Sequence, residues 1–446
     1  MKSNRDKLWL WVSFTSLFLF LTFHHADAVP SFARQTNLAC NTCHTVFPEI
    51  NSFGRNFKLN GYTLTSAETI ESKDNNQKTN LKILKSFPLS AMLQVSHNYI
   101  SKKEPGTGNN VIEFPQQLSF FFAGEITPHV GSFIQITYDD QGAEFGWDNT
   151  DIRIANQTKL ASKNFSYGLS LNNNPTVQDL WNTTPAWGFP YASSAVEPTP
   201  AAATIIDGGL AQEVVGLGIY AMWNNLIYGE ASAYRSSPQG GPFPPDSSSI
   251  GTINGVSPYL RLALQHQWAA QYLEIGAYGL FTELYPIGVG GKTDDYQDIG
   301  IDLQYEQTIS QSVVTAHATW INEKQKLHAT YFYGGSANKT NNLNTFRANL
   351  NYYILQRCGL SLAYFSTTGD ADRLIYSPGS VFGSRTGSPN SNGLIGELQY
   401  LPWLNTKLAV QYMWYNKFNG SKNNYDGSGR NASDNNTLYI LAWIVF

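Results

Sequence analysis

The chain has 446 residues, of which 14% are charged and 14% aromatic, and its formal net charge is −4. This slightly acidic balance argues against nucleic acid as a partner. Beyond the first 28 residues, no stretch of about 18 residues is continuously apolar, so the sequence excludes a helical membrane protein.

Residues 1–28 have the pattern of a secretory signal peptide. Three basic residues precede an apolar run from Leu8 to Phe23, and Ala26-Asp27-Ala28 has the form of a cleavage site. The apolar run is shorter than the ~20 residues that a transmembrane helix needs. We therefore predict that the chain is exported and that the mature protein begins at Val29.

The pentapeptide Cys40-Asn41-Thr42-Cys43-His44 follows the cleavage site closely. Two thiols at this spacing add to the two vinyl groups of one haem, and the adjacent imidazole reaches the iron. The alternatives are a structural disulfide, a zinc half-site or a thioredoxin-like redox pair. A zinc site needs a second ligand pair and a thioredoxin-like site a βαβ pattern, and neither is visible. The motif predicts one covalent haem c, with His44 as proximal ligand of the haem iron.

Apolar residues recur at near-helical spacing after this motif, at Phe47, Ile50, Phe53 and Phe57. Pro48 suits a first helical position and Gly61 the residue after the last turn, so we predict one short amphipathic helix. We expect its aromatic stripe to pack either against the haem or into an ordinary hydrophobic core. Arg55 and Lys58 lie off the stripe and either pair with haem propionates or are solvated. The polar stretch 66–81 is predicted to be a linker.

From Pro88 to Phe446, runs of about 8–14 alternating or aromatic-rich residues are separated by turns. A period of two means that one face of each strand meets an apolar medium. Short connections lie at 127–131, 162–164, 224–225, 269–270, 310–311, 356–357 and 402–405. Longer loops alternate with them, at 101–111, 139–149, 172–210, 236–256, 284–295, 334–342, 367–392 and 419–435.

Seven short turns and eight long loops join sixteen strands. An even count with short turns at one end is how outer-membrane barrels are built, and closure removes exposed strand edges. The last run, Leu438 to Phe446, resembles the C-terminal signature of such barrels. We predict an all-β fold in which residues 88–446 form a 16-stranded antiparallel outer-membrane β-barrel and residues 29–87 a small α-helical monohaem cytochrome c domain with its linker.

The N-terminal residues also resemble those of the fused monohaem cytochrome-porins, which include outer-membrane iron oxidases of bacteria that live on Fe(II). The resemblance covers about 33 residues and rests on Pro30-Ser31-Phe32-Ala33-Arg34-Gln35-Thr36, Leu38-Ala39-Cys40, Cys43-His44, Phe47-Pro48, Phe53-Gly54-Arg55, Phe57-Lys58 and Gly61-Tyr62. It implies a haem domain that plugs the barrel and passes electrons from an extracellular donor to periplasmic c-type cytochromes. Cys40 and Cys43 would be the thioether links and His44 the proximal ligand. The resemblance does not predict the substrate, because the barrel is the part that varies among members of this family.

The distal ligand of the haem iron has two candidates. Side chains alternate between the two faces of a strand, so Met92 lies on the same, lumen-facing side of the first strand as its polar residues, and His97 lies on the other side. A thioether ligand raises the haem potential relative to a second histidine, which suits the acceptance of electrons from iron. His129 competes from the first short turn, at the end where the haem segment enters. Neither residue requires a haem, since Met92 could simply pack in the lumen and His129 could be a solvated turn residue. The remaining alternative is that another residue, or none, is the distal ligand.

The predicted function is electron transfer from an extracellular donor, Fe(II) first among them, to a periplasmic cytochrome, with Fe(II) oxidase activity as a further expectation. A haem in the lumen can approach both sides of an apolar band ~25 Å tall, and a haem outside the barrel cannot. The alternatives are a diffusion porin with a structural or sensory haem, and a peroxidase. A peroxidase needs a distal Arg and His pair, which is not seen near the motif.

Charged residues bear on these alternatives in two ways. A general porin lines its pore with opposing charges, and few charged residues are available here. Two acidic pairs in the predicted outer loops, Asp140 with Glu144 and Asp370 with Asp372, have the chemistry to hold a hard cation. Solvated loop charge is the simpler explanation of both pairs.

Overall fold

The computed structural model describes residues 30–64, 68–76, 78–139, 144–237 and 250–446. The predicted signal peptide, residues 1–28, lies outside these described residues. Within the described ranges, no helix is long and apolar enough to cross a bilayer.

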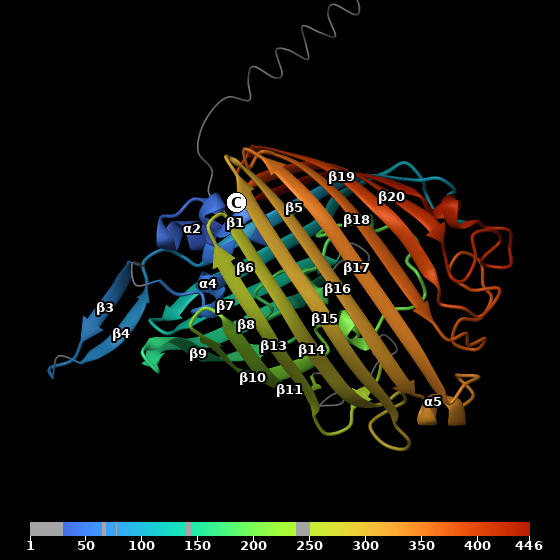
Figure 1. The fold of residues 1–446 in the computed structure, drawn as a ribbon, viewed down its shortest axis with the longest axis horizontal. Coiled ribbons are helices and arrows are strands. Elements are labelled where there is room, and N and C mark those ends of the chain that lie inside the picture. The colour runs from blue at the N-terminus through green and yellow to red at the C-terminus, as the bar shows by residue number, and fades with distance from the viewer. Residues whose placement is uncertain (1–29, 65–67, 77, 140–143, 238–249) are drawn as a thin grey trace, which may run out of the picture.

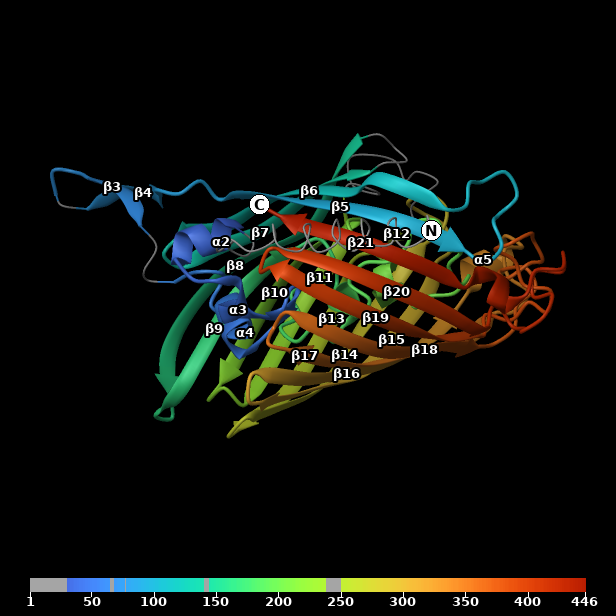
Figure 2. The ribbon, with the colours of Figure 1, turned by 90° about the horizontal axis from the view of Figure 1, so that it is seen from above.

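The chain from Leu89 onward forms one closed antiparallel β-barrel, seen from the side in Figure 1 and from above in Figure 2. Apart from the short strand β12, each strand pairs with the strands before and after it along the wall, and β5 pairs with β21 to close the wall. The strands are β5 (Leu89–Ile100), β6 (Val111–Thr127), β7 (Val130–Asp139), β8 (Glu144–Leu160), β9 (Lys163–Asn172), β10 (Val214–Trp223), β11 (Ile227–Ser236), β12 (Thr252–Ile253), β13 (Ser257–Trp268), β14 (Gln271–Tyr285), β15 (Asp294–Ile309), β16 (Ser312–Lys326), β17 (Thr340–Ile354), β18 (Cys358–Gly369), β19 (Ser391–Trp403), β20 (Thr406–Lys417) and β21 (Thr437–Val445).

Sixteen of these 17 strands form the wall, because β12 is a two-residue strand that pairs with β14 while β11 pairs with β13 directly. The predicted all-β, 16-stranded antiparallel barrel is thus confirmed. The seven short turns also lie where the sequence predicts them. In the β10–β11 turn, Asn224 and Asn225 have φ values of 53° and 50°, a conformation that asparagine tolerates better than most residues.

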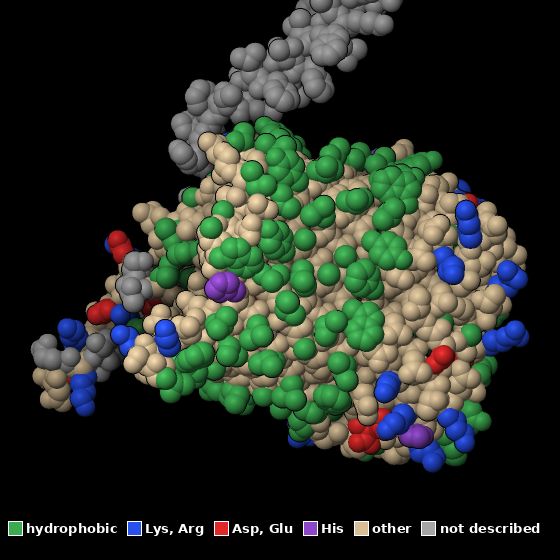
Figure 3. Space-filling model, viewed as in Figure 1, with side chains coloured by type: hydrophobic (Ala, Val, Ile, Leu, Met, Phe, Trp, Pro, Cys, Tyr) green, Lys and Arg blue, Asp and Glu red, His purple; other side chains and the backbone are tan. Residues whose placement is uncertain are grey.

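Alternation along the strands separates an apolar outer face from a packed interior. In β13, Tyr259, Arg261 and Ala263 are buried, whereas the intervening leucines at 260, 262 and 264 are 52–58% exposed. Figure 3 shows hydrophobic side chains spread over this outer wall, with Lys, Arg, Asp and Glu gathered toward its ends. An outward apolar band between polar ends is the surface that a membrane-spanning barrel presents to lipid.

The connection between β9 and β10, residues 173–213, folds into the barrel instead of extending outward as a surface loop. It contains η1 (Pro185–Trp187) and η2 (Ile205–Gly209), and Val177, Leu180 and Trp181 in it are at most 1% exposed. These apolar side chains gain more by packing against the inner wall than by facing water. We call residues 173–213 the inward loop. Two short elements occur in other long loops, α5 (His328–Phe332) and η3 (Ala432–Asn435).

The N-terminal segment, residues 30–64, consists of α2 (Pro30–Thr36), α3 (Cys40–Cys43), β1 (His44–Val46), β2 (Glu49–Ile50) and α4 (Ser52–Leu59). The predicted helix exists but begins at Ser52, because β1 pairs with β2 and places Phe47 and Pro48 in the intervening turn. The side chain of Asn51 then caps α4 by accepting from the backbone N–H groups of Phe53 and Gly54. A Cβ on Gly54 would collide with the carbonyl oxygen of Cys43, so glycine allows α3 and α4 to pack.

This N-terminal segment lies against the inner wall at the short-turn end of the barrel. Gln35 donates to the carbonyl oxygen of Ala123 in β6 at 2.9 Å, and Asn41 donates to Gln356 in the β17–β18 turn at 3.1 Å. The Tyr62 hydroxyl donates to Asp151 in β8 at 2.7 Å. Contacts on opposite parts of the wall hold the segment across the barrel end.

The stretch predicted to be a linker is instead a β-hairpin, β3 (Thr69–Lys73) paired with β4 (Thr79–Leu84). Figures 1 and 2 show it projecting from the short-turn end, away from the barrel. Ile70 and Ile83 face each other across the hairpin and are 51% and 48% exposed. Lys82 pairs with Glu71 on the other face at 3.1 Å. Alternation in this short run was too weak to distinguish a strand from a polar linker.

Candidate functional site

A cavity of about 420 Å³ lies between the N-terminal segment and the inner wall of the barrel. Its wall includes Cys43 and His44 of the sequence motif, Met92 of β5, and residues of the inward loop. Three parts of the chain that are far apart in sequence therefore enclose one space. Its volume is within the range of small-molecule and cofactor sites.

His44 is held in one orientation at this cavity. Its Nδ1–H donates to the carbonyl oxygen of Pro48 at 3.3 Å, so Nε2 is the nitrogen left to bind a ligand. Burial lowers the pKa of the imidazole to about 4, and the ring is therefore neutral near pH 7, the form that binds a metal. Burial also raises the pKa of the Cys43 thiol to about 11.

The two predicted distal ligands differ in position. Met92 is 5% exposed and lines the cavity, with its lumen-facing neighbours Ser90 and Gln94 buried on the same face. This agrees with the predicted parity of β5. His129 is exposed in the β6–β7 turn and is not part of the cavity wall. The geometry thus brings Met92, and not His129, together with His44.

The rest of the cavity wall is mainly aromatic. Phe47 of the N-terminal segment packs edge-on against Trp443 of β21, with ring centroids 5.2 Å apart, and both line the cavity with Trp187 and Tyr191 of the inward loop. The Trp443 Nε1–H is buried without a hydrogen-bond partner among the described residues. A large, flat apolar ligand with a few acceptor atoms suits such a wall.

Lys58 gives the cavity one basic side chain. Its Nζ donates to the carbonyl oxygen of Val177 at 2.7 Å and lies 4.9 Å from the centroid of the Trp187 ring. Burial, and then the positive charge of Arg153, lower the pKa of Lys58 to about 7. The alternative that Lys58 is a solvated surface charge is wrong, because this residue is only 7% exposed.

Arg55 is also buried but is used for anchoring. It forms an ion pair with Glu306 of β15, and its guanidinium carbon lies 4.0 Å from the centroid of the Tyr272 ring. Glu49 accepts from the hydroxyl of Tyr353 at 2.8 Å and from Asn351 Nδ2 at 3.3 Å, both in β17. These contacts attach the N-terminal segment to the wall, and Arg55 is absent from the cavity lining.

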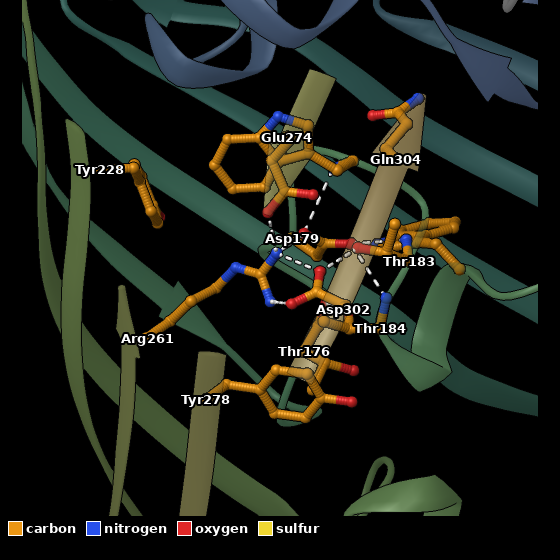
Figure 4. A network of polar contacts seen from close by, with 12 residues as sticks. Thr176, Asp179, Thr183, Thr184, Tyr228, Arg261, Glu274, Tyr278, Asp302 and Gln304 are labelled. Carbon is orange, nitrogen blue, oxygen red and sulfur yellow. Dashed lines mark hydrogen bonds and ion pairs between the residues drawn. The ribbon is translucent and has the colours of Figure 1, made fainter. Parts of the chain in front are cut away.

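A buried polar network joins the inward loop to the barrel wall deeper in the lumen (Figure 4). Arg261 Nη2 lies 2.6 Å from Asp302, 3.3 Å from Glu274 and 3.4 Å from Asp179 of the inward loop, and all four side chains are fully buried. Arg153 makes a second junction, since it pairs with Asp151 at 2.8 Å and donates to the carbonyl oxygens of Lys58 and Gln178.

Sequence reasoning missed both junctions. It expected few charged residues to be available for the pore, whereas the lumen contains buried ionic groups, Arg153 with Asp151 and Arg261 with three carboxylates. Arg153 and Asp151 are two positions apart, but the contacts that join the inward loop to the wall are distant in sequence, 41 positions for Arg261–Asp302 and 119 for Thr183–Asp302, so no local spacing indicates the junctions.

The described acidic pair, Asp370 with Asp372, is not arranged to hold a cation. Asp372 is 1% exposed and accepts from the backbone N–H groups of Ala337, Asn338 and Leu374, and Asp370 accepts from Asn342 at 2.7 Å. Asp140 of the other pair lies outside the described residues. Across the part of the chain that the structure describes, no group of three or more His, Cys, Asp or Glu side chains is placed to hold a metal ion.

Comparisons with known proteins give fold-level likenesses only. No protein-family profile matches the chain, and no curated protein matches it. Among solved structures, an anion-selective porin from Comamonas acidovorans aligns with 80% of this chain and 98% of its own at 11% identity and a TM-score of 0.46. The outer membrane channel DcaP of Acinetobacter baumannii aligns with 80% of this chain and 96% of its own at 14% identity and a TM-score of 0.45. A loop-deletion mutant of OmpT, an outer membrane protein of Vibrio cholerae, aligns with 80% of this chain and 98% of its own at 12% identity and a TM-score of 0.44.

Proposed function

We propose that this chain is an electron-transfer protein of the bacterial outer membrane, in which one haem c is covalently bound in the barrel lumen. The donor is extracellular, with Fe(II) as the substrate, and the acceptor is a periplasmic c-type cytochrome. The observation that carries the proposal is the cavity, since His44 of the Cys-x-x-Cys-His motif and Met92 of β5 both line it. Residues 29–87 are then a cytochrome plug with its hairpin, and residues 88–446 the transmembrane barrel.

The residues at the cavity fit a haem c: Cys43 and His44 line it, and Cys40 is buried at the other end of the short helix α3. Cys40 and Cys43 would hold the porphyrin by thioether bonds, and His44 has its Nδ1–H committed to Pro48, which leaves Nε2 for the iron. Lys58 and the unpaired Nε1–H of Trp443 are available to the propionates. The bound haem would supply a site that gains and loses one electron.

The packed lumen favours this function over a diffusion porin. A pore for solutes needs lumen-facing side chains in contact with water, whereas Glu274, Asp302 and Arg261 are at most 4% exposed. The inward loop and the N-terminal segment both occupy the lumen. A barrel of this kind lets an electron pass while the ferric product, which is insoluble, stays outside.

The Met92→Ala variant is expected to have a lower reduction potential or an altered low-spin spectrum, because a thioether ligand favours the ferrous state. A redox titration followed by absorbance measures both. His129→Ala is the matched control and should leave spectrum and potential unchanged. If Met92→Ala behaves as wild type and His129→Ala does not, the assignment of the distal ligand reverses.

Fe(II) added to the fully oxidised wild-type protein is expected to reduce the haem. The reaction should persist when Fe(II) is chelated on a bead too large to enter the barrel, since only the electron has to pass. Protein inserted in vesicles with its long loops outward gives the test, with haem absorbance as the readout. If Fe(II) leaves the haem oxidised while a small organic reductant reduces it, iron is not the donor and the electron-transfer function stands with another donor.

A further inference from the structure

Two groups of packed aromatic rings, linked through one buried hydrophobic cluster, lead from the cavity wall toward the long loops. Tyr191, which lines the cavity, contacts Phe189 edge-on with ring centroids 5.7 Å apart. Phe189 packs in one buried cluster with Tyr415, Phe418 and Tyr425. The centroids of Tyr415 and Phe418 are 5.0 Å apart, and those of Phe418 and Tyr425 are 4.7 Å apart. We call these five residues the aromatic column.

The aromatic column spans much of the membrane-facing height of the barrel. Near the cavity, Gln411 of β20 donates to the carbonyl oxygen of Ala192, next to Tyr191, at 3.3 Å. At the other end, Phe418 follows the end of β20, and the Tyr425 hydroxyl donates to the carbonyl oxygen of Val381 in the β18–β19 loop at 2.6 Å. The seven steps from Gln411 to Phe418 cover about 23 Å of extended strand. At the ~35–45° tilt of barrel strands, this length corresponds to about 16–19 Å of the ~25 Å apolar membrane band.

A second group of lumenal aromatic residues is interrupted by charge. Trp181 and Tyr228 pack edge-on 5.2 Å apart near the N-terminal segment, and Tyr234 and Tyr259 belong to a separate buried cluster with Tyr278. Arg261 lies between the two groups, 5.0 Å from the Trp181 ring and 5.5 Å from the Tyr278 ring, with its three carboxylates around it. In the aromatic column, by contrast, the charged groups each contact a single ring: Glu197 accepts from the Tyr415 hydroxyl at 2.6 Å, and Lys407 Nζ lies 5.9 Å from the centroid of the Tyr191 ring.

We propose that the aromatic column is the route by which an electron crosses the barrel from a donor at the outer loops to the cavity. The inference rests on the proposed function. One electron leaves the ferrous donor, which becomes ferric, and the haem iron passes from ferric to ferrous. No bond or proton moves, and the column residues are not oxidised. Tunnelling falls off less steeply through closely packed atoms than across gaps, and the column supplies such packing.

Phe418→Leu and Phe189→Leu should each slow the reduction of the haem by bead-bound Fe(II) at least tenfold. The proteins are inserted in vesicles in a Cys358→Ala background, and labels on cysteines placed at Ser388 and Ser310 identify the outward end. Phe418→Trp, which restores an aromatic ring, should recover most of the rate. Tyr259→Leu is the matched control, a buried aromatic residue outside the column, and should keep the wild-type rate.

Measurements that do not depend on the external donor show whether the column residues carry the electron or only stabilise the fold by packing. The haem spectrum, its reduction potential and its reduction by dithionite in detergent should be the same in all variants. Thermal unfolding of the same substitutions in the haem-free Cys40→Ala/Cys43→Ala chain reports loss of packing alone. Equal rates in wild type, Phe418→Leu and Phe189→Leu would overturn the route and leave the proposed function intact. A wild-type protein without covalent haem would overturn the proposed function itself.

Discussion

Replacement of both motif cysteines, Cys40→Ala/Cys43→Ala, is expected to abolish covalently bound haem. Thioether bonds survive denaturation, so wild-type protein on a denaturing gel should keep haem-dependent peroxidase staining and the double variant should lose all of it. Cys358→Ala is the matched control, since Cys358 lies at the start of β18 and should be dispensable for staining. Wild-type haem that extracts into acidified organic solvent would show that the attachment is not covalent.

Arg261→Met is expected to destabilise the protein by about 3–5 kcal/mol, because it leaves buried carboxylates without their cation. Asp302, Glu274 and Asp179 surround Arg261 at 2.6–3.4 Å, and Asp179 belongs to the inward loop. The substitution should therefore release the inward loop as well as lower the urea midpoint. Equilibrium unfolding in urea and protease cleavage of the loop measure the two effects.

Arg347→Met is the matched control for that experiment. Arg347 pairs with Asp207 of the same inward loop, but its side chain is 40% exposed, so the loss should be at most about 1 kcal/mol. Neutralising the carboxylates in an Arg261→Met/Asp302→Asn/Glu274→Gln chain should recover part of the stability. Equal midpoints for Arg261→Met and wild type would show that the network contributes little to folding.

The barrel could be predicted from sequence because its strands depend on local rules. Period-two alternation sets which side chains face outward, and residues such as Asn224 and Asn225 mark tight turns. The parity argument that placed Met92 toward the lumen rests on the same geometry. The Cys-x-x-Cys-His motif is likewise local, so His44 could be proposed as a ligand without any knowledge of the fold.

Long-range packing decided the features that could not be predicted. Phe47 and Ile50 have the spacing of a helical stripe, but the pairing of β1 with β2 places them before the helix. The N-cap residue, Asn51, lies inside the stripe and was therefore not recognised as the start of the helix. The sequence predicts an external loop for residues 173–213, because their contact partners, such as Arg261, lie on strands far along the chain. The cavity itself exists only where the N-terminal segment, β5 and the inward loop meet.

The pairing of β5 with β21 sets an order of assembly. Ala91 and Phe446 exchange backbone hydrogen bonds at 2.7 and 2.9 Å, so the first strand of the wall waits for the last one to be made. Until then, the barrel has two unpaired edges and its interior is open at the side. The N-terminal segment is synthesised first and enclosed last. Residues 40–44 lie at the short-turn end of the barrel, so a group attached to them is surrounded by a complete wall only after that seam forms.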